Sequence, residues 1–241
     1  MKITFWGTRG STPTPGKNTT LYGGNTTCLE VDLESKRKII IDAGTGLRPL
    51  GTKLIAESEK VDIFLLMTHV HWDHIWGFPF FEPLYNPSTK ISIDGCQTCI
   101  SGLISTFDHR VMDGVFPVAF KDVPADLRYF EVLKEEALYI DDVVIDAINL
   151  HHPQGGFAYR LEENGKSLVF MTDNEITAGN LPPEQIEFCR GADILIHDAQ
   201  YTPEEMDLRK GWGHSDYATA LDLAEKAEAK RLILTHHDPK R

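Results

Sequence analysis

Short clusters of apolar residues recur along the chain, and most of them predict β-strands. They are rich in Val, Ile, Leu and Phe and are bounded by turn-forming residues, which predicts strands at 27–33, 38–42, 61–68, 157–162, 167–172, 192–197 and 231–235. Residues 2–6 show the same strand-like pattern at the N-terminus.

Helical spacing of apolar residues is clearest near the C-terminus. In 215–230, Tyr217, Ala220, Leu221 and Ala224 fall on one face, and Ser215 is the predicted N-cap. Shorter helices are predicted at 47–57 and 203–209. Strands that alternate with helices predict an α/β sheet protein. The segment 82–134 is the least regular, and it is interpreted as a cap inserted over a site.

One turn makes a long-range prediction. Asn164-Gly165 lies between two predicted strands, and this dipeptide suits a two-residue hairpin whose turn positions both need a positive φ. A hairpin brings the far ends of its strands together. We therefore expect His152 to lie near Asp173.

Composition narrows the class of substrate. The 241 residues are 41% hydrophobic and 25% charged, as in ordinary globular proteins, and carry a formal net charge of −12. This charge repels long polyanions, and no Lys/Arg cluster offsets it, so a small substrate is favoured and no long nucleic acid is expected. No apolar run is long enough to span a membrane, and a cytoplasmic location is expected.

Other residues receive weaker interpretations. Cys96 and Cys99 form a C-x-x-C pair without a second pair, so reduced thiols are favoured over a zinc knuckle or a redox pair. An aromatic group follows the 69–74 segment and is expected to be mostly core, with one or two members lining a pocket: Trp72, Trp76, Phe78, Phe80, Phe81 and Tyr85.

The strongest chemical signal follows the predicted strand 61–68. His69, His71, Asp73 and His74 are four metal-ligand side chains within six residues, at the carboxyl end of a strand, where α/β sheets place ligand sites. One ion cannot take all four from so short a loop, whereas two ions can share them. The sequence therefore predicts a dinuclear metal site.

Further ligand candidates end other predicted strands. Asp173 follows 167–172 and His236 follows 231–235. A carboxylate has two oxygens and can bridge two ions, so Asp173 is the natural bridge. The pairs His151/His152 and His236/His237 leave open, by spacing alone, which member of each faces the site.

The ordered set resembles the metallo-β-lactamase fold, an αββα sandwich, over nearly the whole chain. Asp42, in Ile41-Asp42-Ala43-Gly44, matches the first motif of that family, an aspartate that orients a ligand. The resemblance implies a single hydrolase domain over 1–241. It also implies that one metal is held by His69, His71 and His152, the other by Asp73, His74 and His236, with Asp173 bridging.

Segments outside the metal motifs resemble the phosphodiesterase branch, which includes ribonuclease Z and bacterial cyclic phosphodiesterases. These segments are 5–13, 22–26 and Gly213-His214-Ser215. The resemblance implies a catalytic role for His214 near the scissile phosphate. A helix beginning after Ser215 would also favour a phosphate at its N-terminus. The basic arm with which ribonuclease Z grips tRNA has no counterpart here.

The resulting hypothesis is a dinuclear phosphodiesterase for a small phosphodiester such as a cyclic nucleotide or cyclic phosphate. Its cofactors would be two divalent ions, Zn²⁺ or else Mn²⁺ or Fe²⁺, with Asp73 orienting the hydroxide and His214 acting on the phosphate. The sequence is compatible with a homodimer. The alternatives are a lactonase or thioesterase, a tRNA-processing endonuclease and a non-catalytic binding protein. A flavodiiron oxidoreductase is disfavoured because that branch has a carboxylate where this chain has His71.

Overall fold

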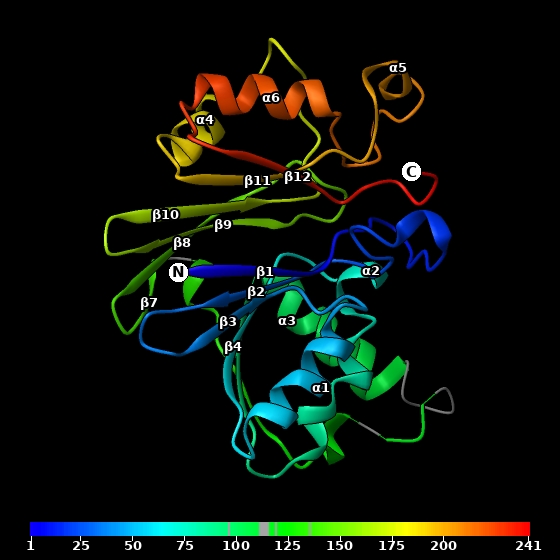
Figure 1. Ribbon diagram of the computed structural model, residues 1–241, viewed down its shortest axis with the longest axis vertical. Helices are drawn as coiled ribbons and strands as arrows, with labels where there is room; N and C mark the ends of the chain where they lie inside the picture. The colour runs from blue at the N-terminus through cyan, green and yellow to red at the C-terminus, as the bar shows by residue number, and fades with distance from the viewer. Residues whose placement is uncertain (96, 111–115, 119, 135) are drawn as a thin grey trace.

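Two stacked β-sheets with helices on their outer faces form the molecule. The computed structural model describes residues 1–95, 97–110, 116–118, 120–134 and 136–241. Within these residues each sheet has six strands. Figure 1 shows α4 and α6 outside one sheet and α1 and α3 outside the other, which is the predicted αββα sandwich.

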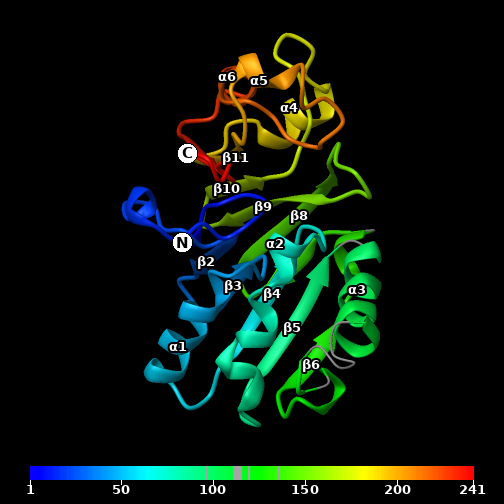
Figure 2. The ribbon, with the colours of Figure 1, turned by 90° about the vertical axis from the view of Figure 1, so that its right-hand side faces the viewer.

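The first sheet has the order β1-β2-β3-β4-β5-β6. Its first three strands are antiparallel and the next pairings are parallel. Figure 2 shows β4, β5 and β6 side by side with α3 next to them. The strands are β1 (Lys2–Gly7), β2 (Cys28–Asp32), β3 (Lys38–Ile41), β4 (Asp62–Met67), β5 (Lys90–Gly95) and β6 (Asp126–Tyr129).

The second sheet has the order β12-β11-β10-β9-β8-β7, with parallel pairing only between β10, β11 and β12. The Asn164-Gly165 turn joins β9 to β10 as predicted, and both residues have a positive φ. The strands are β7 (Leu138–Ile140), β8 (Val143–Asn149), β9 (Phe157–Glu163), β10 (Lys166–Met171), β11 (Ile194–Asp198) and β12 (Leu232–Thr235).

Helices and short helical turns connect the strands. The α-helices are α1 (Leu47–Glu57), α2 (Trp72–Ile75), α3 (Gln97–Ile104), α4 (Pro183–Cys189), α5 (Pro203–Met206) and α6 (Tyr217–Lys226). The short turns are η1 (Lys17–Thr19), η2 (Phe78–Phe80), η3 (Glu82–Tyr85), η4 (Ser105–Arg110), η5 (Phe120–Asp122) and η6 (Val132–Lys134). Within the described ranges, no helix has the length and apolarity that crossing a membrane requires.

Strand β10 shows why the sheets stack. Leu168 and Phe170 face the core between the sheets, whereas Val169 and Met171 face the core under α4 and α6. Because alternate side chains of a strand point to opposite faces, a strand buried on both faces is apolar throughout. At roughly 1.5–3 kcal/mol for each buried large apolar side chain, these two cores hold the strand ends in place.

Part of the segment 82–134, interpreted above as a cap, belongs to the first sheet. Strands β5 and β6 lie within it and pair parallel to the first sheet. Two such short strands, separated by irregular chain, leave little periodicity in the sequence, although Ile91 and Ile93 are fully buried.

Two further predictions are corrected. The N-cap of α6 is Asp216, whose carboxylate accepts hydrogen bonds from the N–H groups of Ala218 and Thr219. Ser215 is buried and instead donates to the carbonyl of Asn174. An acidic cap occupies the helix N-terminus, so a phosphate is not expected there. The 203–209 helix is shorter than predicted, ending at Met206.

The predictions for the aromatic group and for the cysteines agree only in part with the structure. Phe78 and Phe81 are fully buried, but the rest of that aromatic group is exposed: Trp72, Trp76, Phe80 and Tyr85. Two of the exposed members, Trp76 and Phe80, line a pocket, as expected for one or two of the group. Cys28 and Cys189 are free, as expected. Cys99 is disulfide-bonded, which corrects the expectation of reduced thiols. Cys96 lies outside the described residues.

Candidate metal centre

The ligand-type residues of the sequence motif meet where the carboxyl ends of strands from both sheets face each other. His69, His71, Asp73 and His74 follow β4, and Asp173 and His236 follow β10 and β12. Asp173 and His236 have φ values of 60° and 57°, in the left-handed region that non-glycine residues seldom adopt. Such strained backbone is typical of functional sites and bends the chain sharply at each strand end.

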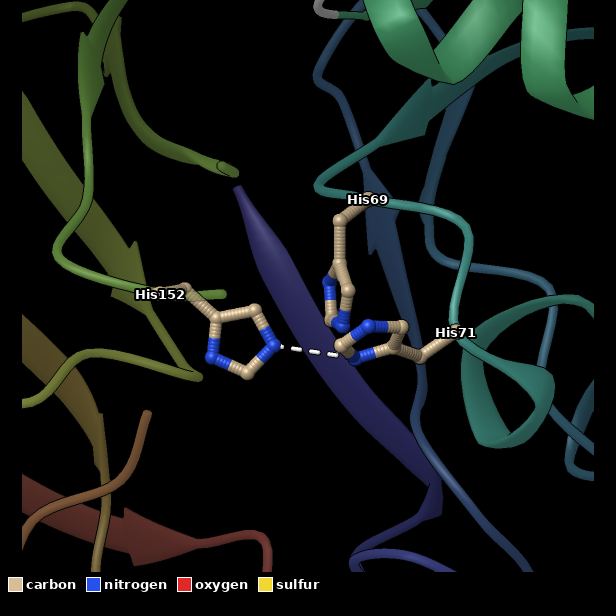
Figure 3. A group of neighbouring side chains, drawn as sticks. All are labelled: His69, His71 and His152. Carbon is tan, nitrogen blue, oxygen red and sulfur yellow. Dashed lines mark hydrogen bonds between the residues drawn. The ribbon is translucent and has the colours of Figure 1, made fainter. Parts of the chain in front are cut away.

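One group consists of His69, His71 and His152. Figure 3 shows the first two on the loop after β4 and His152 on the opposite loop, with the three rings turned toward one another. The distance from His152 Nε2 to His71 Nδ1 is 3.0 Å, and the His69 ring centroid is 4.6 Å from each of the other two. One nitrogen of each ring could serve the same ion.

The second group consists of Asp73, His74 and His236. His236 Nε2 is 3.1 Å from Asp73 Oδ2 and 3.2 Å from His74 Nε2, and all three side chains are buried. These atoms could also hold one ion.

Asp173 lies between the two groups. Its Oδ1 is 3.8 Å from His69 Nε2 and 4.0 Å from His152 Nε2, while its Oδ2 is 3.3 Å from His74 Nε2. One carboxylate therefore reaches both groups, which is the geometry that a bridging ligand needs.

The outer contacts fix which nitrogen each histidine turns inward. His74 Nδ1 donates to Asp42 at 2.8 Å, His152 Nδ1 donates to the Gly213 carbonyl at 2.9 Å, and His71 Nε2 donates to Gln154 at 2.7 Å. Asp42 is fully buried and also accepts from the backbone N–H of Thr68. Partners of this kind set the tautomer of metal-binding histidines.

The inward nitrogens fit a cation. With their other nitrogens donating, His71 Nδ1 and His152 Nε2 both carry a lone pair, and these lone pairs face each other at 3.0 Å. The buried His69 Nε2 has no hydrogen-bond partner within the described part of the chain. Facing lone pairs repel and a buried unpaired acceptor is costly, and a metal ion removes both penalties.

Charges in the cluster favour the same conclusion. Burial alone would raise the pKa of Asp73 and Asp173, but His74 and His236 outweigh it and hold both pKa values well below the usual range. Burial depresses the pKa of His69 well below its ordinary value. Ionised carboxylates and the neutral His69 imidazole are the forms that bind metal ions. Burial lowers the pKa of His74, but Asp173, Asp73 and Asp42 raise it well above its ordinary value, so His74 must lose a proton when a metal ion binds.

His214 lies beside both groups. Its Nδ1 is 3.3 Å from Asp198 Oδ2 and 3.6 Å from Asp173 Oδ1, and its ring stacks on His236 with centroids 5.1 Å apart. Burial lowers the pKa of His214, but the hydrogen bond to Asp198 and the charge of Asp173 raise it above the usual value. By distance alone His214 could also join a metal group.

The match to known families decides the classification. Residues 37–237 match the family described as Beta-lactamase superfamily domain. The chain belongs to the beta-lactamase superfamily. Because the match spans most of the chain and includes the residues that converge here, the αββα sandwich is the metallo-β-lactamase fold.

Several relatives of this superfamily member are named as ribonucleases. Ribonuclease Z of Lacticaseibacillus casei is 25% identical, covering 98% of this chain and 84% of its own, and ribonuclease BN of Proteus mirabilis is 24% identical, covering 98% and 88%. The structure of human tRNase Z, short form, superposes with a TM-score of 0.71 at 22% identity, covering 100% and 94%. This chain is therefore a metal-dependent hydrolase.

The structure resolves the two ambiguous histidine pairs. His151 is exposed, whereas His152 enters the centre. His237 lines a separate cavity with Phe5 and Thr8, whereas His236 enters the centre. Asp198 is the partner of His214. The sequence does not pair these two residues, because the contact spans 16 positions and depends on packing.

Proposed function

We propose that this superfamily member is a dinuclear phosphodiesterase whose preferred substrate is a small phosphodiester such as a cyclic nucleotide or cyclic phosphate. In this proposal His69, His71 and His152 hold one divalent ion, Asp73, His74 and His236 hold the other, and Asp173 bridges them. The observation that carries it is the convergence of both groups on Asp173, with His214 alongside. Zinc suits these ligands best, with manganese or iron as alternatives.

Each protein group has a defined task in this proposal. When bound, two divalent ions supply Lewis acidity, which makes water acidic near neutral pH and neutralises phosphoryl oxygens. Asp73 is held in place by the backbone N–H of Ser11 at 2.7 Å and orients the attacking water. Asp198 holds His214 Nδ1, so Nε2 is left to donate a proton to the leaving oxygen.

The preference for a small substrate rests on charge and on chain length. A net charge of −12 opposes a long polyanion, whereas a single phosphodiester charge can be met locally by the ions and His214. The ribonuclease Z alignment spans 277 positions, more than the 241 residues of this chain, so that relative carries segments without a counterpart here.

An RNA endonuclease is the second candidate. It is favoured by the sequence relatives, which are ribonucleases Z and BN. An enzyme that contacts many RNA phosphates should bind less tightly as salt rises, with a steep logarithmic slope.

We therefore expect kcat/KM to be highest on a cyclic nucleotide. The measurement compares 3′,5′- and 2′,3′-cyclic nucleotides, an aryl phosphodiester, a lactone, a thioester and a precursor tRNA on the metal-loaded enzyme. Efficient, salt-sensitive cleavage of the tRNA would select the second candidate. Faster turnover of the lactone or thioester would contradict phosphodiesterase activity altogether.

A further inference from the structure

The loop 207–213 brings exposed aromatic and cationic side chains to the edge of the metal centre. The carbonyl of Gly213, its last residue, accepts the hydrogen bond from His152. Gly213 has a φ of 84°, and a Cβ there would lie 2.2 Å from His152 Nδ1. Only glycine therefore lets the loop approach the histidine this closely. The neighbouring Trp212 is 55% exposed.

Glu175 holds this loop rigidly. Its two carboxylate oxygens accept hydrogen bonds from the backbone N–H groups of Gly211 and Gly213, at 2.8 Å and 2.7 Å. Glu175 itself lies two residues after Asp173. The backbone of the loop is thus tied to the same strand end that supplies Asp173.

Arg209 supports the indole of Trp212. Its guanidinium carbon lies 4.6 Å from the Trp212 ring centroid and 5.6 Å from that of Tyr201. The Tyr201 ring in turn meets His214 edge-on, with centroids 5.9 Å apart. No carboxylate pairs with Arg209 within 4.0 Å among the residues that the structure describes. The cation is therefore held by aromatic faces, which orients Trp212 while over half of its side chain stays in water.

We propose that Trp212 is a stacking site for the nucleobase of the substrate and that Arg209 positions the indole for it. This inference rests on the proposed phosphodiesterase function and narrows its substrate class to nucleotides. A base offers a π-face to an aromatic side chain whatever its sequence, and the phosphate attached to it would reach the neighbouring centre. A base stacked there would cover the exposed part of the Trp212 side chain.

Two esters with the same leaving group separate base recognition from chemistry. We expect the holoenzyme to favour thymidine 5′-(4-nitrophenyl) phosphate over methyl 4-nitrophenyl phosphate in kcat/KM, on the order of tenfold. Trp212→Ala should bring this ratio close to one, Trp212→Phe should keep most of it, and Arg209→Ala should reduce it. The control Tyr139→Ala removes a 72% exposed aromatic on β7 and should leave the ratio unchanged. Equal losses on both esters in Trp212→Ala would show a structural role and overturn the proposal.

A binding measurement keeps this test independent of turnover. In calorimetric titrations of the holoenzyme, adenosine 5′-monophosphate should bind about tenfold more tightly than ribose 5-phosphate, and Trp212→Ala should abolish the difference. If neither ester is hydrolysed but this difference persists, the proposed function fails and the base site stands. Equal binding of the two phosphates, or a preference that survives in Trp212→Ala, refutes the base site.

Discussion

Among the histidines of the centre, the partner of one ring nitrogen decides the role of the other. His152 and His74 each give one N–H to an outer acceptor, so that a lone pair faces inward. The His214 Nδ1 likewise faces carboxylates, those of Asp198 and Asp173. In the proposed function its remaining nitrogen acts on the substrate.

His214→Ala should retain the metal ions and lose turnover. The expected loss in kcat is on the order of 10²–10⁴-fold, the usual contribution of one positioned acid or electrostatic group. Phosphodiester kinetics and elemental analysis of the same preparation give both quantities. The exposed His151→Ala is the control and should change neither. Metal loss in proportion to activity would make His214 a ligand, which its 3.6 Å distance to Asp173 makes a real alternative.

Helix α6 depends on its acidic cap. Asp216 is only 6% exposed and binds two backbone N–H groups as well as the hydroxyl of Thr219, at 2.7–3.0 Å. This helix covers the outer core under β10 and β11, through Leu223 among others. Loss of the cap should thus be felt in the stability of the second sheet.

Asp216→Ala should lower the free energy of unfolding by about 0.5–2 kcal/mol, since three N–H or O–H groups lose their acceptor. Urea denaturation measures the change. Asp216→Asn keeps an acceptor at the cap and should recover most of the stability. If alanine and asparagine destabilise equally, charge rather than hydrogen bonding determines the contribution of this residue.

The centre joins the two halves of the whole molecule. Four of its ligand-type residues follow β4 of the first sheet, and the others belong to the second sheet: His152, Asp173 and His236. Ions bound there would connect the sheets and would bind the folded state alone. Metal binding should consequently be coupled to stability.

Elemental analysis of the isolated protein should find close to two transition-metal ions for each chain. Removing them with a chelator should lower Tm, and free zinc at a thousand times Kd should restore about 4 kcal/mol of stability. Asp73→Ala and His74→Ala should each reduce the metal content. One ion per chain, with both variants unchanged in content and activity, would contradict the dinuclear proposal.

Local chemistry made much of this molecule predictable. The apolar strands, the helix 47–57 and the Asn164-Gly165 hairpin depend on neighbours in sequence, and all three were confirmed. The hairpin also carried the proximity of His152 to Asp173, since a two-residue turn fixes the register of both strands. The ligand-type residues at strand ends also predict the metal centre from the sequence alone.

The other features of the fold and of the centre depend on packing between segments that are distant in the sequence. Packing selected His152 and His236 from their pairs and brought Asp198 to His214. It also placed β5 and β6 in the first sheet. It also set the Trp212 loop beside the centre through Gly213 and Glu175. Sequence periodicity reports which face of an element is buried, but not against what, because that depends on how two sheets stack and where their strand ends meet.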